Sequence, residues 1–426
     1  MTLRTRHIME QIKRGNVPEG YKKTKAGIFP AGWDVYMLGD CLSRVERPVE
    51  VKPNELYTQI GIRSHGRGLF YKEPVTGAAL GNKAVFWIEP DCFIVNIVFA
   101  WEQAIGKTTQ SEVGMIGSHR FPMYRPVNDR VDIDYLISYF LTKRGTDILE
   151  AASPGGAGRN KTLGQDRFLK SKITLPPIEE QQKIATILTT QDRVIELKEK
   201  RLAEKQRQKK YLMQQLLTGK KRLPGFSEEW KIKPLKKLTE KQKKKNHGFQ
   251  YRLVLSNSAQ HGIVSQDQEF DKEIANEERI DGYYVVIPGA FVYNPRISVT
   301  APCGPINVNE TGETGIMSPL YTVFTISSPQ ISQDFLKYYF QSSCWYKYVK
   351  EVANYGARHD RISISDGDFF DMPIPLPTKE EQSYIAEVLS TADHEIDLLQ
   401  QDIEQEKQKK KALMQLLLTG IVRVKT

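Results

Sequence analysis

Two stretches of the chain have apolar residues at alternating spacings of three and four, the pattern of a long amphipathic helix with a narrow apolar stripe. They run from Leu175 to Gly219 and from Leu376 to Gly420. Pro176 and Pro377 stand at the starts of these stretches, and a Thr-Gly pair ends each one. The pattern predicts two helices of about 40 residues, each about 60 Å long. The predicted apolar seam consists of Ile184, Leu188, Ile195, Leu202, Leu212 and Leu216 in the first helix, and Ile385, Leu389, Ile396, Leu399, Ile403, Leu413 and Leu417 in the second.

The two stretches are copies of each other. They align without a gap at an offset of 201 residues, and 21 of the 45 positions are identical. Fainter similarity continues upstream, where Trp33 matches Trp230 and Asn96 matches Asn294. An internal repeat of this kind predicts that each copy is a globular domain followed by one long helix.

Polar residues interrupt both seams. They are Gln191, Lys198, Lys205 and Lys209 in the first helix, and Glu406 and Lys410 in the second. A helix with so narrow an apolar stripe is expected to pair with another such helix, and polar seam residues then help to select the register. Two like units in one chain pack most simply about a pseudo-twofold axis, so we expect an antiparallel coiled coil. The alternative is that each helix packs on its own domain.

The first turns of the predicted helices are acidic. Glu179, Glu180, Glu380 and Glu381 are expected to complement the helix dipole, and Thr378 with Glu381 predicts a capping box.

The remaining sequence favours mixed α and β structure. Strands are predicted at 84–88, 92–99, 283–287, 290–294 and 321–326, and short helices at 134–142 and 334–342. We therefore expect an α+β chain with mostly antiparallel sheets, made of two mixed domains joined by the two long helices. Its predicted parts are a first globular domain at 1–174, a central helix at 175–222, a second globular domain at 223–375 and a C-terminal helix at 376–426.

Composition and charge narrow the class of protein. The 426 residues carry a formal charge of +10, and no apolar run is long enough to cross a membrane. A cytoplasmic, globular protein is expected, and a basic balance favours polyanion partners. The four cysteines are scattered without metal-ligand spacing, so neither disulfides nor a metal site is expected.

Catalytic motifs are missing. Gly106, Lys107 and Thr108 fit the end of a phosphate-binding loop, but Trp101 stands where that loop needs its first glycine. The YNPR run at 293–296 lacks the second proline and the aromatic residue that an amino-methyltransferase uses to hold a flipped base. We therefore expect neither a catalytic residue nor a cofactor in this chain.

Basic and amide side chains in Gly-rich segments are the candidates for DNA contact. Arginine and asparagine suit guanine and adenine edges, and lysine mostly contacts phosphate. The candidates are Arg63, His65, Arg67, Lys72, Arg159, Asn160 and Lys161 in the first domain, and Asn257, His261, Asn294, Arg296, Arg358, His359 and Arg361 in the second.

The doubled EEQ helix start, the doubled LLTG stop and the openings FPAGW and LPGFSEEW together resemble the specificity subunit of type I DNA restriction-modification systems. The resemblance covers essentially the whole chain. It implies that each domain reads one half of a split, asymmetric site in double-stranded DNA, with the coiled coil as a ruler. It also implies two methyltransferase subunits and ATP-dependent restriction subunits as partners, which would use the methyl donor and ATP. Thr378 and Lys379 depart from Pro177 and Ile178 of the first copy.

Two other classes of protein stay open. One is a methyltransferase or nuclease with an unfamiliar site, and the other is a coiled-coil scaffold that binds only proteins. Incubation with a labelled methyl donor, or with Mg²⁺ and plasmid, separates out the enzyme. A DNA-binding assay over a salt series separates out the scaffold, because few phosphate contacts give a flat response.

Because no catalytic motif is found, we predict that the purified chain alone transfers no methyl group to DNA. A filter assay with radiolabelled methyl donor measures this. Robust methylation by the chain alone would contradict the non-enzyme interpretation.

Overall fold

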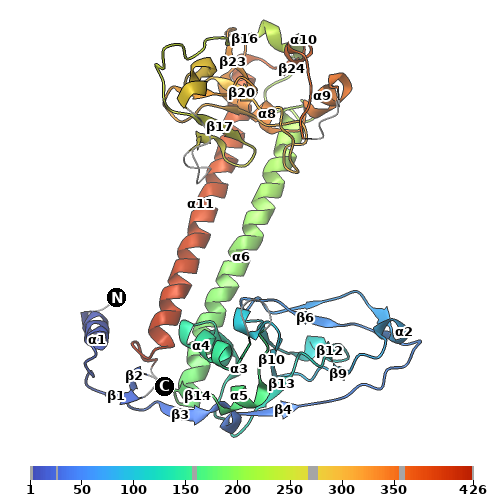
Figure 1. The fold of residues 1–426 in the computed structure, drawn as a ribbon. Coiled ribbons are helices and arrows are strands. Elements are labelled where there is room, and N and C mark those ends of the chain that lie inside the picture. The colour runs from blue at the N-terminus through green and yellow to red at the C-terminus, as the bar shows by residue number, and fades with distance from the viewer. Residues whose placement is uncertain (1–2, 25–26, 156–160, 267–276, 355–359, 425–426) are drawn as a thin grey trace. The chain divides into compact units, whose positions relative to one another are not determined.

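The structure is a computed structural model that describes residues 3–24, 27–155, 161–266, 277–354 and 360–424 (Figure 1). Contacts divide the chain into two compact units. Unit 1 contains residues 1–198 and 402–426, and unit 2 contains residues 199–401. Each long helix therefore contributes one segment to each unit. The predicted division into two domains and two separate helices differs from these two units, and it stays a prediction.

Unit 1 is built from short strands and helices. Its strands are β1 (Tyr21–Thr24), β2 (Gly27–Pro30), β3 (Asp34–Met37), β4 (Leu42–Val45), β5 (Leu56–Tyr57), β6 (Ile60–Ile62), β7 (Leu69–Tyr71), β8 (Val75–Thr76), β9 (Val85–Trp87), β10 (Phe93–Val95), β11 (Ile105–Lys107), β12 (Ile116–Ser118), β13 (Met123–Pro126) and β14 (Lys172–Leu175). Its helices are α1 (Leu3–Lys13), α2 (Gly77–Leu80), α3 (Ile133–Phe140), α4 (Lys143–Ala151) and α5 (Gln165–Lys170), with parts of α6 (Ile178–Leu216) and α11 (Lys379–Leu417).

Unit 2 repeats the plan, and the elements below are those of its described residues. Its strands are β15 (Lys231–Pro234), β16 (Thr239–Lys241), β17 (Leu255–Ser258), β18 (Gly262–Ser265), β19 (Tyr284–Val286), β20 (Phe291–Tyr293), β21 (Ile306–Val308), β22 (Gly315–Met317), β23 (Thr322–Ile326) and β24 (Pro373–Leu376). Its helices are α8 (Gln333–Gln341), α9 (Tyr346–Val352) and α10 (Asp366–Phe370), with the remaining parts of α6 and α11.

The sheets show the internal repeat directly. Unit 1 has a four-stranded sheet in the order β11-β10-β13-β4, and unit 2 has one in the order β21-β20-β23-β16. The two-stranded pairs correspond as well, since β3 with β14 and β9 with β12 match β15 with β24 and β19 with β22. All paired strands in the described residues are antiparallel. The expected α+β fold with antiparallel sheets is confirmed.

Each predicted apolar run contains a strand, but the run at 92–99 is strand only from Phe93 to Val95. The side chain of Asn96 ends it, because its Oδ1 accepts a hydrogen bond from the backbone N–H of Val98 and turns the chain. Aromatic rings fill the core behind this sheet. Phe93 packs against Phe140 and Phe168, with ring centroids 5.5 and 6.1 Å away.

Both long helices begin inside a domain core. Ile184 and Leu188 of α6 are buried in the core of unit 1, and Ile385 and Leu389 of α11 are buried in that of unit 2. At the helix starts, the stripe expected to pair the two helices instead completes a domain core, as the alternative interpretation expects. Among the described residues, no helix has the length and apolar character to cross a membrane.

A carboxylate is buried in the first turn of each long helix. In unit 1, Glu180 is fully buried and accepts two hydrogen bonds from Arg423, at 2.6 and 2.7 Å. The indole N–H of Trp33 donates a third at 3.3 Å. These contacts, rather than the helix dipole alone, explain the acidic residue at this position.

Unit 2 has the same arrangement. The buried carboxylate of Glu381 accepts from Arg222 at 2.6 and 2.8 Å and from Trp230 at 2.9 Å. The predicted capping box is half correct. Thr378 accepts from the backbone N–H of Glu381 at 3.3 Å, but the Glu381 carboxylate turns to Arg222 instead of returning to Thr378.

The glutamine of each EEQ motif is also buried and holds the loop before a short helix. Gln181 accepts from the backbone N–H of Asp132, the N-cap of α3, and donates to the carbonyl of Arg130. Gln382 does the same for Ser332, the N-cap of α8, and for the carbonyl of Gln330. The repeated motif thus fixes how each long helix enters its domain.

Removing the arginine should leave a buried, uncompensated carboxylate. We predict that Arg222→Met lowers the free energy of unfolding of unit 2 by about 3 kcal/mol, measured by urea titration. Adding Glu381→Gln should recover part of the loss, because the amide is neutral. Arg193→Met is the control, since Arg193 and Glu196 form an exposed pair on α6, and it should change stability by less than about 0.5 kcal/mol. Equal small effects of Arg222→Met and Arg193→Met would show that the buried pair contributes little.

Candidate functional site

The basic candidates of unit 1 gather on one hairpin. Strands β6 and β7 pair in register from Ile60 with Tyr71 to Ile62 with Leu69. Arg63, His65 and Arg67 occupy the turn between them, and Lys72 follows the second strand. All four side chains are exposed. The hairpin therefore presents three basic or ionisable groups on its turn, and Lys72 at the opposite end of β7.

Local contacts hold this turn in place. The guanidinium of Arg63 donates to the carbonyl of Leu69 at 2.7 Å and lies 5.0 Å from the centroid of the Phe70 ring. The backbone N–H of His65, a residue in the left-handed region at φ 61°, donates to the carbonyl of Glu102 at 2.8 Å. Glu102 belongs to a 3-10 helix of one turn, Ala100–Glu102.

Lys161 reaches the same 3-10 turn. Its ammonium lies 5.3 Å from the ring centroid of Trp101. The structure thus brings Lys161 and the β6–β7 hairpin to one short segment, although about 90 residues of sequence separate them. Their shared chemistry, several cations on aromatic supports, suits phosphate and base contact.

In unit 2 the structure brings two of the candidates together. Arg296 is exposed directly after β20, and its backbone forms a bridge with that of Arg361. Arg361 is half-buried and lies 3.5 Å from the carboxylate of Asp360. Arginines from segments 65 residues apart therefore meet at one edge of the unit.

Asn257 and Asn294 have a structural role instead. Both are buried. Asn257 donates to the carbonyl of Val292 at 2.7 Å, and Asn294 donates to the carbonyl of Asn257 at 3.0 Å. Because these amides already bond the backbone of β17 and β20, they are not available to DNA, and we leave them out of the proposed contact set.

His261 is exposed in the β17–β18 turn, away from this arginine pair. It lines a cavity of about 780 Å³ whose wall includes the carboxylates of Glu310, Asp393 and Asp397. Lys337 and Lys209 also line this cavity and pair with Glu310 and Asp393, so its charges are largely compensated. Arg159, Asn160, Arg358 and His359 lie outside the described residues.

Polar seam residues pair the two helices within unit 1. Gln191 of α6 donates to the carboxylate of Glu406 on α11 at 2.6 Å, and Lys198 donates to Asp402 and Glu406 at 2.8 and 2.9 Å. Lys410 pairs with Asp192 at 2.5 Å. Rising residue numbers on α6 meet falling numbers on α11, so these segments are antiparallel.

Unit 2 shows the same kind of pairing. Lys205 of α6 donates to Glu395 of α11 at 2.6 Å, and Lys209 pairs with Asp393. The hydroxyl of Tyr338 also donates to Asp393, at 3.0 Å. Every predicted polar seam residue therefore bonds to the opposite helix.

The apolar seam positions are buried or half-buried. Those that are buried are Ile184, Leu188, Ile195, Leu216, Ile385, Leu389, Ile396, Ile403 and Leu417. Those that are half-buried are Leu202, Leu212, Leu399 and Leu413.

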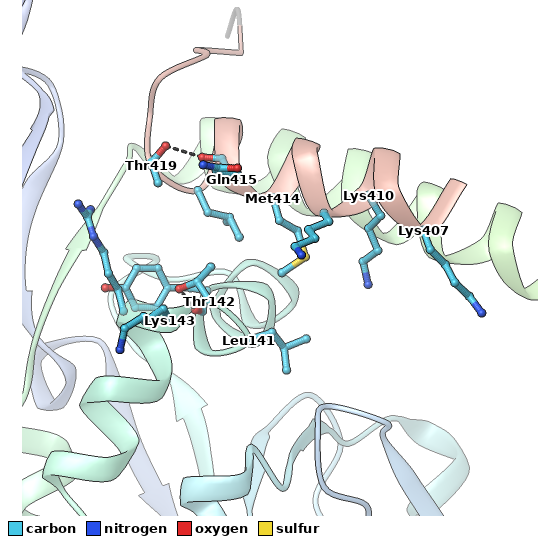
Figure 2. Close-up of a pocket in the computed structure, with 12 residues that line it drawn as sticks. Leu141, Thr142, Lys143, Lys407, Lys410, Met414, Gln415 and Thr419 are labelled. Atoms are coloured by element: carbon cyan, nitrogen blue, oxygen red, sulfur yellow. Dashed lines mark hydrogen bonds between the residues drawn. The ribbon is translucent and has the colours of Figure 1, made fainter. Parts of the chain in front are cut away.

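A pocket that the sequence did not indicate lies in unit 1 between the α3–α4 corner and the last turns of α11 (Figure 2). Its volume is about 560 Å³. Leu141 and Met414 supply apolar surface, while Lys143 and Lys407 extend at its rim (Figure 2). This chemistry suits a ligand with an apolar body and acidic groups.

Metal-ligating side chains and cysteine chemistry give no candidate centre in the described residues. No group of three or more His, Cys, Asp or Glu residues there could hold a metal ion. All four cysteines are free, and burial raises the pKa of the Cys41 thiol to about 11. A thiol with so high a pKa stays protonated near neutral pH and is a poor nucleophile.

Comparisons with known proteins identify the family of this two-unit chain. The model of the type I restriction modification DNA specificity domain matches residues 88–206 and 227–408, well over half of the chain. The chain therefore belongs to this family, that of the specificity subunits of type I restriction-modification systems.

Individual relatives are similar over nearly their whole lengths. The type I restriction enzyme MjaVIII specificity subunit of Methanocaldococcus jannaschii is 25% identical, with 96% of this chain and 97% of the relative covered. The MjaX specificity subunit from the same organism is 24% identical, with 96% and 98% covered.

Solved structures share the fold. The HsdS subunit from Thermoanaerobacter tengcongensis matches with a TM-score of 0.51 and 18% identity, covering 92% of this chain and 98% of that one. A chain from a structural study of complex assembly in the type I R-M system matches with a TM-score of 0.58 and 18% identity, covering 92% and 99%.

The seam pairing in unit 1 should make stability depend on pH. Hydrogen bonds, first from Lys198 and then from Gln191, lower the pKa of Glu406 from 4.5 to about 2. A lowered folded pKa contributes stability that is present above about pH 4.5 and lost as pH falls toward 2. We predict that Glu406→Gln melts with a shallower loss of Tm between pH 5 and 2 than the unchanged chain, followed by circular dichroism.

Glu404→Gln is the matched control on the same helix, because the exposed Glu404 accepts from Gln408 rather than from a lysine. Its Tm should fall with pH in parallel with that of the unchanged chain. Parallel curves of Tm against pH for all three proteins would mean that the hydrogen bonds across the seam do not lower the pKa of Glu406.

Proposed function

We propose that this specificity subunit reads a bipartite, asymmetric site in double-stranded DNA, with one unit reading each half. The observation that carries the proposal is that two units with corresponding four-stranded sheets carry different basic segments. Unit 1 presents the β6–β7 turn with Arg63, His65 and Arg67, and unit 2 presents Arg296 beside Arg361. Two domains with the same fold but different contact residues read different half-sites. The whole site is then not palindromic, whereas two identical domains would bind a palindrome.

The coiled coil sets the spacing between the half-sites in this proposal. Its support is the register of the polar seam, in which every interrupting residue bonds to a residue on the opposite helix. Because each of these bonds fits only one alignment of the helices, the pairing resists sliding.

The chemistry of the complex comes from partners. We propose that the chain directs two methyltransferase subunits, which modify adenine with a methyl donor, and ATP-dependent restriction subunits. The chain's own residues contribute affinity through lysines and arginines, and specificity through the recognition loops. The expected cytoplasmic location follows from this role, because the DNA that the chain would read is there.

A coiled-coil scaffold without DNA specificity is the alternative function. The pocket between α4 and α11 favours it, because an apolar floor with lysines at the rim suits a protein segment rather than DNA. The two functions differ in salt dependence. DNA affinity that falls steeply with salt supports DNA reading, and no specific DNA binding supports the scaffold.

Lengthening the seam should change the spacer. We predict that four residues inserted after Lys205 in α6 add about 6 Å of helix and change the gap between half-sites by up to about two base pairs, leaving each half unchanged. Methylated-site sequencing of DNA treated with the assembled complex measures the gap.

Four residues inserted after Gly225 are the control. Gly225 lies in the loop after α6, where an added Cβ would meet open space, so the recognised site should not change. An unaltered spacer in the Lys205 insertion, with methylation retained, would refute the ruler.

A further inference from the structure

A cavity of about 460 Å³ lies in unit 1 behind the β6–β7 hairpin. This volume is within the range of small-molecule sites. Phe70, Phe99 and Phe121 give its wall aromatic surface, and Asn96, Glu102 and Lys72 supply polar groups. Aromatic faces with a few convergent polar groups are the usual lining of a site for a planar heteroaromatic ligand.

Asn96 is the polar group in this cavity with an unused hydrogen-bond donor. Asn96 is 9% exposed, and its Oδ1 accepts a hydrogen bond from the backbone N–H of Val98 at 3.1 Å. That bond fixes the orientation of the amide, because a backbone N–H needs an acceptor. The Nδ2 of Asn96 has no acceptor among the described residues. This donor is accessible from the cavity rather than sealed in the core, so it is available to an acceptor that enters the cavity.

The repeat provides an internal comparison. Asn294 follows β20 as Asn96 follows β10, and its Oδ1 accepts from the backbone N–H of Arg296 at 3.0 Å in the same way. Its Nδ2, however, donates to the carbonyl of Asn257 at 3.0 Å. The same side chain in the same turn is therefore satisfied in unit 2 and open to a cavity in unit 1.

The other groups complete a donor and acceptor pattern. Glu102 accepts from the hydroxyl of Ser64 at 3.0 Å through one carboxylate oxygen, and the second oxygen can accept from a ligand. Lys72 is exposed at the cavity and carries a positive charge for phosphate. Gly61 has no side chain, and a Cβ there would overlap the ring of Phe70, so glycine allows that ring to line the cavity.

We propose that this cavity binds one nucleobase with a carbonyl beside a ring N–H, as thymine and guanine have. The carbonyl accepts from Nδ2 of Asn96, the N–H donates to Glu102, and the ring packs on the phenylalanines. This deepens the proposed function, because a base of the DNA leaves its stack to enter unit 1. Unit 2 lacks the equivalent site, since Asn257 already uses the amide of Asn294.

The test uses the full chain and dye-labelled oligonucleotides of about eight thymidines, cytidines or adenosines, with affinities from fluorescence anisotropy. The thymidine oligomer should bind about tenfold more tightly than the other two. In Asn96→Asp the side chain still accepts from Val98, but an oxygen replaces the donor. The thymidine preference should then disappear, because the thymine carbonyl faces a carboxylate instead of an amide donor.

Lys161→Ala is the control. It removes a cation that lies on Trp101 outside the cavity, so it should weaken all three oligomers by the same factor. Melting curves of both variants report whether the fold is retained. Equal affinity for the three oligomers, or an unchanged ranking in a folded Asn96→Asp chain, would overturn the base site.

Two further measurements distinguish a free nucleotide from a base of DNA as the ligand, and the base site from the proposed function. Thymidine monophosphate that competes as well as the oligomer would show that the cavity takes a free nucleotide, which overturns the DNA assignment. Salt-sensitive duplex binding without any oligomer ranking would refute the base site and leave the proposed function standing. Loss of both would refute the proposed function as well.

Discussion

A buried carboxylate at the start of each long helix is the constraint on which the rest of the structure depends. Glu180 and Glu381 have no access to solvent, so each needs its arginine and tryptophan partners in place. The neighbouring glutamines then fix the loops before α3 and α8. One turn of helix thereby determines how a 39-residue helix is attached to its domain.

The two junctions are assembled from different parts of the sequence. In unit 2, Arg222 and Trp230 come from one short segment after α6, whereas in unit 1, Arg423 and Trp33 come from opposite ends of the sequence. Tyr21 makes a further contact of this kind in unit 1, because its hydroxyl donates to the carbonyl of Gly420 at 2.8 Å. Segments almost 400 residues apart in the sequence therefore contact each other in unit 1.

The scaffold is repeated, but the surfaces it carries are not. Asn257, Asn294 and Asn307 join β17, β20 and β21 into one hydrogen-bonded group in unit 2. In unit 1 the matching Asn96 faces a cavity instead. A shared framework with different polar groups at corresponding positions is what two readers of unlike half-sites need.

The sequence predicted the features that depend on local pattern. The repeat, the two long helices, the strand-containing runs and the polar seam positions all follow from spacing, which local physics controls. Burial of Glu180 was missed because an acidic first turn is stable in solvent too. The signal was present, since Glu180, Arg222 and their counterparts Glu381 and Arg423 repeat at the same offset of 201. The different roles of Asn96 and Asn294 could not be predicted, because both occupy the same motif and only the neighbouring strand decides which amide is bonded.

Mapping methylated adenines across the host genome, with and without the gene for this chain, tests the central claim most directly. Two unlike readers on one rigid spacer predict one motif that depends on the chain, made of two different half-sites separated by a gap of constant length. A continuous or palindromic motif, a variable gap, or a pattern of methylation that persists without the chain would contradict the account.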